Sequence, residues 1–100
     1  MNLLQEKIKE ITTLCELSKV KSLFAFGSVL TADFNSESDI DLLVEIKSND
    51  PLDYSDNYFK LKFQLEKLFN RPIDLLEIKS LKNSFVKQQI DSTKILLYAA

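Results

Sequence analysis

The 100-residue chain lacks histidine and tryptophan and has one cysteine, one glycine and two prolines. Without histidine, it cannot use a histidine general base, a histidine-activated nucleophile or a histidine zinc ligand. The lone Cys15 excludes an internal disulfide and a cysteine-rich metal site, which fits the reducing cytoplasm where we expect the protein to work. The scarcity of glycine and proline argues against a disordered chain.

Long apolar runs and an excess of one charge are also missing. No apolar run approaches the roughly 20 residues that a membrane-spanning helix needs, and the charges near the start do not suit a signal peptide. Thirteen basic and fifteen acidic residues give a formal net charge of −2, which does not favour binding to nucleic acid. The ordinary composition predicts a single domain over residues 1–100 with one core.

Apolar residues that recur at three- and four-residue steps predict three helices, over residues 3–17, 54–70 and 81–90. The second must end before Pro72, because proline has no N–H to continue the helical hydrogen bonds. Cys15 falls on the apolar side of the first helix, where we interpret it as a small buried hydrophobe.

Apolar runs and alternation predict four strands, over residues 23–26, 39–46, 73–78 and 95–98. In the second of these, Ile40, Leu42, Val44 and Ile46 share one face, Asp39, Asp41 and Glu45 share the other, and Leu43 breaks the pattern. The order of the elements predicts an α/β (α+β) fold with a small mixed sheet of three to four strands and helices packed on one face.

Three acidic residues on these strands are candidates for chemistry. Alternation puts Asp39 and Asp41 on one side, with Cα atoms about 6.5 to 7 Å apart, and Asp74 joins them if the next strand pairs alongside. Two carboxylates about 5 Å apart repel by around 3 kcal/mol at an effective dielectric near 20. A raised pKa or a hard cation such as Mg²⁺ would relieve this repulsion. The alternative is that these acids simply face solvent, and that Gly27-Ser28 is an ordinary turn.

The joint spacing of these motifs is more specific than any one of them. Phe26-Gly27-Ser28 is followed, after nine residues, by Ser38-Asp39-Ile40-Asp41-Leu42, and Ile73-Asp74-Leu75 comes later. With this pattern the chain resembles the minimal nucleotidyltransferases of the DNA polymerase beta-like superfamily over nearly its whole length.

The resemblance implies transfer of a nucleoside monophosphate, AMP from ATP, to a hydroxyl group. By that resemblance Asp39 and Asp41 would each hold one of two Mg²⁺ ions, and Asp74 would bind the catalytic ion and favour deprotonation of the hydroxyl. Gly27 would let a phosphate approach the backbone, and Ser28 would hydrogen-bond it. Small members of this family pair with helical HEPN-type toxins, so the resemblance also implies an antitoxin whose acceptor is a tyrosine of the toxin.

One segment departs from the family pattern. Members usually continue Gly-Ser with a segment containing Arg-Gly, whereas residues 29–33 of this chain read VLTAD. The missing arginine would have faced the triphosphate; Lys79 or Lys82 could replace it, although a solvated surface explains both lysines as well. The departure keeps open a second function, that of a binding module with little or no catalysis that neutralises a partner protein by docking.

Overall fold

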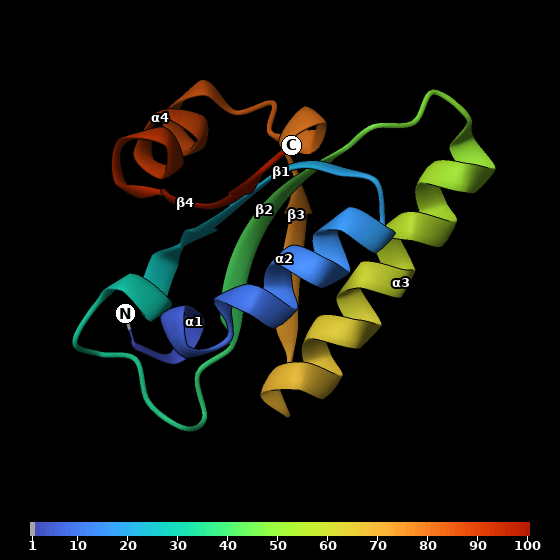
Figure 1. Ribbon diagram of the computed structural model, residues 1–100. Coiled ribbons are helices and arrows are strands. Elements are labelled where there is room, and N and C mark those ends of the chain that lie inside the picture. The colour runs from blue at the N-terminus through green and yellow to red at the C-terminus, as the bar shows by residue number, and fades with distance from the viewer. Residues whose placement is uncertain (1) are drawn as a thin grey trace.

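The computed structural model describes residues 2–100, which form a four-stranded mixed sheet in the order β3-β2-β1-β4 (Figure 1). The strands are β1 (Val20–Phe26), β2 (Ile40–Ile46), β3 (Ile73–Glu77) and β4 (Ile95–Ala99). β1 runs antiparallel to β2 and to β4, and β2 runs parallel to β3. The predicted small mixed sheet is therefore confirmed.

The helices are α1 (Asn2–Glu6), α2 (Ile8–Leu17), α3 (Pro51–Phe69) and α4 (Ser84–Thr93), with short 3₁₀ turns η1 (Gly27–Leu30) and η2 (Ile78–Ser80). The single helix predicted over residues 3–17 is interrupted at Lys7, whose ψ of 14° departs from the helical value. None of the helices within residues 2–100 is long and apolar enough to cross a membrane.

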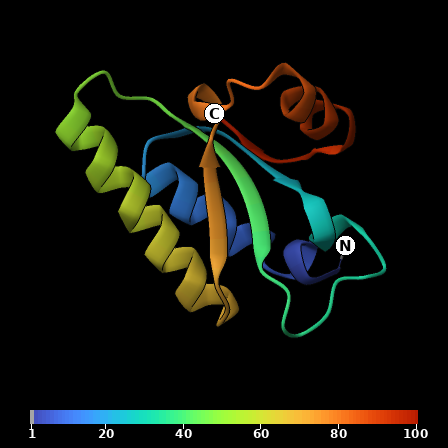
Figure 2. The same ribbon diagram turned by 180° about the vertical axis from the view of Figure 1, so that it is seen from behind.

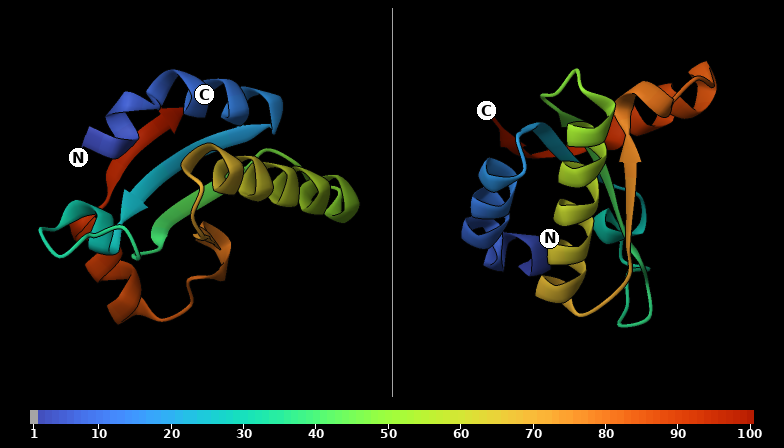
Figure 3. Two further views of the ribbon diagram at one scale, coloured as in Figure 1. Left: turned by 90° about the horizontal axis from the view of Figure 1, so that it is seen from below. Right: turned by 90° about the vertical axis from the view of Figure 1, so that its right-hand side faces the viewer.

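The helices divide between the two sides of the sheet. α2 and α3 cover one side, as the sequence predicts, whereas α4 lies on the opposite side, as the views from behind, from below and from the right show (Figures 2 and 3). The core fills the space between the sheet and the helices α1 to α3. Its buried members include Leu4, Ile11, Cys15, Leu23, Ala25, Ile40, Leu42, Val44, Leu61, Leu65, Ile73 and Leu75.

Burial confirms that Cys15 is a core residue. Its side chain is fully buried, and this burial is the main reason that the pKa of its thiol rises to about 12. A thiol with so high a pKa stays protonated at neutral pH, so Cys15 is a packing residue and not a nucleophile.

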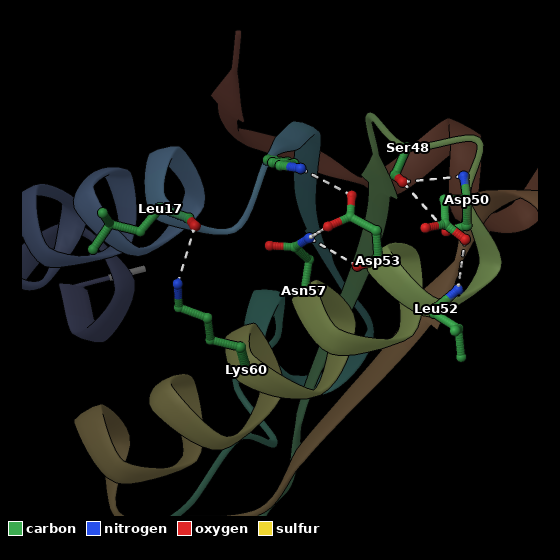
Figure 4. Close-up of polar contacts among 8 residues, drawn as sticks. Leu17, Ser48, Asp50, Leu52, Asp53, Asn57 and Lys60 are labelled. Atoms are coloured by element: carbon green, nitrogen blue, oxygen red, sulfur yellow. Dashed lines mark hydrogen bonds and ion pairs between the residues drawn. The ribbon is translucent and has the colours of Figure 1, made fainter.

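Polar contacts fix the start of α3 and attach the helix to α2 (Figure 4). At its start, the Asp50 side chain accepts a hydrogen bond of 3.2 Å from the backbone N–H of Leu52. At its end, Asn70 takes the left-handed conformation, with φ of 53°. Between them, Lys60 Nζ donates a 3.2 Å hydrogen bond to the Leu17 carbonyl. Since α3 is the crossover between β2 and β3, it makes these strands parallel and brings their starts to the same edge of the sheet.

Candidate active site

The side of the sheet opposite α2 and α3 carries the predicted acids. Their neighbours along β2 and β3 are buried in the core, so alternation turns the acids the other way. We call this side the carboxylate face and define it by Phe24, Asp41, Leu43, Glu45, Asp74 and Leu76. It is not entirely open to solvent, because Leu43 is 1% exposed.

Asp41 and Asp74 are neighbours on this face. They are register partners in the parallel pair of β2 and β3, where adjacent strands lie about 4.8 Å apart. Burial raises the pKa of the Asp41 carboxyl, and the charges of Asp74 and then Asp39 raise it further. Asp39 is exposed and lies directly before β2. The structure thus brings Asp41 and Asp74 together and leaves Asp39 at the rim, close enough to act on Asp41 through its charge.

The turn after β1 is fitted to the same carboxylate. Gly27 has φ of 75°, and a Cβ atom built there would collide with Asp41 Oδ2 and lie 3.3 Å from Asp41 Cγ. The backbone N–H of Ser28 donates a hydrogen bond to the Asp41 carboxylate, which lowers its pKa and partly offsets the effect of burial. In this structure the space beside Gly27 is therefore filled by Asp41, whereas the sequence led us to expect a phosphate there.

A segment missed in the sequence analysis lies beside the turn. A hollow of about 450 Å³ is lined by Gly27, Leu30 and Thr31 from the turn and by Thr93 and Ile95. The junction of α4 and β4 therefore adjoins the Gly27 turn. The pairing of β4 with β1 brings this junction next to the turn, and no motif in the sequence predicts that contact.

Arg71 holds the loop that carries Asp39. Its Nη1 donates 3.0 Å hydrogen bonds to the carbonyls of Asn35 and Ser38, and its guanidinium lies 4.7 Å from the centre of the Phe34 ring. In the sequence, Arg71 stands only as the residue before Pro72, at the end of the second predicted helix. That it is the chain's single arginine was the one available signal.

Asp39, Asp41 and Asp74 are suited to a hard divalent ion by their oxygen donors, although they do not form a complete coordination site. Within the part of the chain that the structure describes, no three acidic or cysteine side chains are placed so as to hold a metal ion. Mg²⁺, however, is usually bound by one or two carboxylates and completes its shell with water and substrate phosphates. Asp41, with Asp74 beside it and Asp39 near, offers that kind of donor set.

The lysines suggested as replacements for the missing arginine are not well placed. Lys79 lies beyond the end of β3, more than about 10 Å from Asp74 along the strand. There its Nζ lies 3.7 Å from the centre of the Tyr54 ring, on the α3 side of the sheet. Lys82 is exposed in the segment between η2 and α4. The structure gives neither lysine a contact with the acids.

The sequence is similar to known families and proteins. Residues 7–97 match the family described as nucleotidyltransferase domain. MJ1379 of Methanocaldococcus jannaschii, named as a candidate protein adenylyltransferase, is 39% identical over 77% of this chain and 76% of its own. MJ0128 of the same organism, named in the same way, is 35% identical over 80% of this chain and 79% of its own.

Solved structures share the fold. A candidate minimal nucleotidyltransferase matches with a TM-score of 0.77 and 24% identity over 94% of this chain and 92% of its own. A chain of a toxin–antitoxin complex with AMP-PNP matches with 0.70 and 21%, over 93% and 73% of the two chains. A chain of a Shewanella oneidensis complex between tri-AMPylated HEPN toxin and MNT antitoxin matches with 0.65 and 20%, over 97% and 73%.

Proposed function

The chain belongs to the nucleotidyltransferase domain family, and from that premise we propose that it transfers AMP from ATP to a hydroxyl group of a partner protein. The names of the two archaeal relatives support a protein as the acceptor. The observation that carries the proposal is the pairing of Asp41 with Asp74, with the Gly27 turn packed on the same carboxylate.

The reaction needs a nucleophilic hydroxyl, a phosphate held in place and a leaving group. A bond forms between the acceptor oxygen and the α-phosphorus, the bond to the β-phosphate oxygen breaks, and pyrophosphate leaves. Asp74, exposed on the edge strand β3, is accessible to the acceptor and would take up its proton. Ser28, which follows Gly27 in the turn, would hydrogen-bond a phosphate.

Asp39, Asp41 and Asp74 are the residues that would hold Mg²⁺. When bound, the ion would neutralise charge that develops on the phosphates. Burial and the charges of Asp74 and Asp39 raise the pKa of Asp41, and a cation bound beside it would favour its ionised form.

We further propose that the acceptor is a tyrosine of a HEPN-type toxin and that this chain is the antitoxin. The solved structures of similar fold support this partner, since one contains an AMPylated HEPN toxin with its MNT antitoxin. AMP-PNP in another complex supports an adenine nucleotide as the donor.

The test is to incubate the chain with α-labelled ATP, Mg²⁺ and the HEPN-type protein whose gene neighbours its own. We expect label on the partner with wild type and none with Asp39→Asn/Asp41→Asn. Glu45→Gln is the matched control, because Glu45 lies on the same face and strand but pairs with Lys21 at 3.7 Å near the far end. If the double variant still transfers label, these carboxylates do not take part in the reaction.

The second candidate function is neutralisation of the partner by docking alone. The observation in its favour is the VLTAD segment, where the usual arginine is missing and exposed Asp33 adds a negative charge. If wild type binds the partner and suppresses its toxicity while no label is transferred, docking is the correct account. If the double variant binds the partner but no longer suppresses toxicity, transfer is the correct account.

A further inference from the structure

We propose that Lys94 is the cation that binds the outer phosphates of the nucleotide. The inference rests on the proposed function, since it assigns a new residue to the ATP site. ATP brings several negative charges to a face that already carries Asp41 and Asp74, so a protein cation on that face would stabilise the complex in addition to any metal.

The backbone fixes Lys94 at the junction of α4 and β4. It caps the end of α4, where its N–H donates a 2.8 Å hydrogen bond to the Ile90 carbonyl, and the chain then enters β4. Ile95 pairs with Ala25, so one step further Lys94 comes level with Phe26, and Phe26 pairs with Asp41. The lysine and the acid therefore lie in one row across the sheet, two strands or about 10 Å apart.

The side chain of Lys94 points over the carboxylate face. Its Nζ lies 4.3 Å from the centre of the Phe24 ring, and Phe24 belongs to that face. The side chain is 24% exposed, so the ammonium is partly shielded from water and its attraction to an anion is less screened than that of a fully exposed lysine. This ammonium lies over Phe24, two residues along β1 from the row of Asp41 and Phe26. A triphosphate with its α-phosphate at Asp41 and Asp74 would approach it by extending across the sheet, away from the acceptor at β3.

Asp91 holds Lys94 when the nucleotide is absent. Lys94 Nζ and Asp91 Oδ1 form an ion pair of 2.8 Å, and Asp91 is the more exposed of the two side chains, at 42%. Because a polyphosphate carries more negative charge than a single carboxylate, it can displace Asp91 from the ammonium. Lys21, which also contacts this face, is held by Glu45 at the other end of β2 and cannot take the same role.

The experiment is calorimetric titration of the full chain with AMP-PNP and with AMP, in the presence of Mg²⁺. Lys94→Met keeps the aliphatic stem over Phe24 and removes the charge, and Lys94→Arg restores the charge. We expect Lys94→Met to weaken AMP-PNP binding by about 10- to 100-fold, the worth of one charge-assisted hydrogen bond. AMP has no outer phosphates, so its affinity should be unchanged.

Two further variants sharpen the result. Lys87→Ala, an exposed lysine of the same helix, should leave both affinities unchanged. Asp91→Asn should tighten AMP-PNP binding, because it removes the competing carboxylate. If Lys94→Met weakens both ligands equally or neither, Lys94 does not bind the outer phosphates, although the proposed function stands. If wild type binds neither nucleotide, the proposed function and this inference both fail.

Discussion

The two faces of strand β2 differ in role: one packs in the core, and the other carries acidic side chains. On the α2–α3 side, Ile40, Leu42 and Val44 are at most 1% exposed and belong to the core. On the other side, Asp41 and Glu45 are half-buried and carry charge. Because side chains alternate along a strand, one seven-residue segment both stabilises the fold and presents the site.

The two faces also contribute to the free energy of folding with opposite signs. Each buried aliphatic side chain of the core favours folding by about 1.5–3 kcal/mol. The ionised form of Asp41, by contrast, is disfavoured in the folded protein by burial and by its acidic neighbours. Substitutions should therefore separate stability from activity according to the face on which they lie.

The largest effect is expected from Asp74→Asn. Loss of this carboxylate should lower the rate of AMP transfer by about 10³-fold, the scale seen when a main electrostatic contributor to a transition state is removed. The melting temperature should not fall, because Asp74 is exposed. Label transfer and thermal unfolding measure the two effects. Asp56→Asn, an exposed acid on α3, is the control, and equal rates in the two variants would contradict the assignment.

On the core side, Leu42→Ala should reduce the free energy of unfolding by about 2–5 kcal/mol, since it opens a cavity where Leu42 is 1% exposed. Urea denaturation measures the loss. Leu52→Ala is the matched control, because Leu52 is 77% exposed and its removal should change stability little. Similar losses in both variants would mean that the core is not packed as described.

Gly27→Ala should cost about 1–3 kcal/mol, because the new Cβ meets Asp41 at a positive φ. A double-mutant cycle separates the two causes. In an Asp41→Ala background the collision with the carboxylate is removed and the strain remains, so the cost of Gly27→Ala should be smaller there. Equal costs in the two backgrounds would show that Asp41 does not occupy the space beside Gly27.

The smallest effect, and the sharpest test of sign, is the pH dependence of two acids. The pKa of Asp41 is raised in the folded protein, so its ionisation costs stability as pH rises from about 3.8 through the folded value. The pKa of Asp53 is lowered, first by its hydrogen bond with Lys19, so its contribution is present above about 3.8 and is lost as pH falls through the folded value.

Urea denaturation over a pH series in metal-free buffer distinguishes these signs. Asp41→Asn should become more stable relative to wild type as pH rises through its window, by less than about 1 kcal/mol. Asp53→Asn should become less stable relative to wild type as pH rises toward 3.8. The same sign for both variants would contradict the opposite pKa shifts of these two acids.

Much of the site follows from the sequence through local rules. Alternation along residues 39–46 predicts the face of Asp41. Asp74 is expected beside it if the next strand pairs alongside, and the parallel pairing of β2 with β3 meets that condition. Residues 19–22 are mixed in polarity and gave no strand signal, yet β1 begins at Val20 because Val20 pairs with Ile46. That pairing joins distant parts of the chain, which local pattern does not encode.

The contacts that could not be predicted are likewise long-range. The fit of Gly27 against Asp41 depends on the pairing of β1 with β2, and the position of Lys94 depends on the pairing of β1 with β4. Sequence reasoning therefore considered Lys79 and Lys82 for the missing cation and overlooked Lys94. Of these lysines, Lys94 alone is held against the carboxylate face by a contact that the structure gives.

The most direct test of the central claim is a crystal structure of the chain soaked with Mn²⁺ and AMP-PNP, with anomalous diffraction to locate the metal. We predict an anomalous peak in contact with Asp41, bridged to a phosphate oxygen of the nucleotide, with Asp39 and Asp74 adjoining it. A fully occupied nucleotide bound elsewhere, with no peak at these acids, would contradict the account.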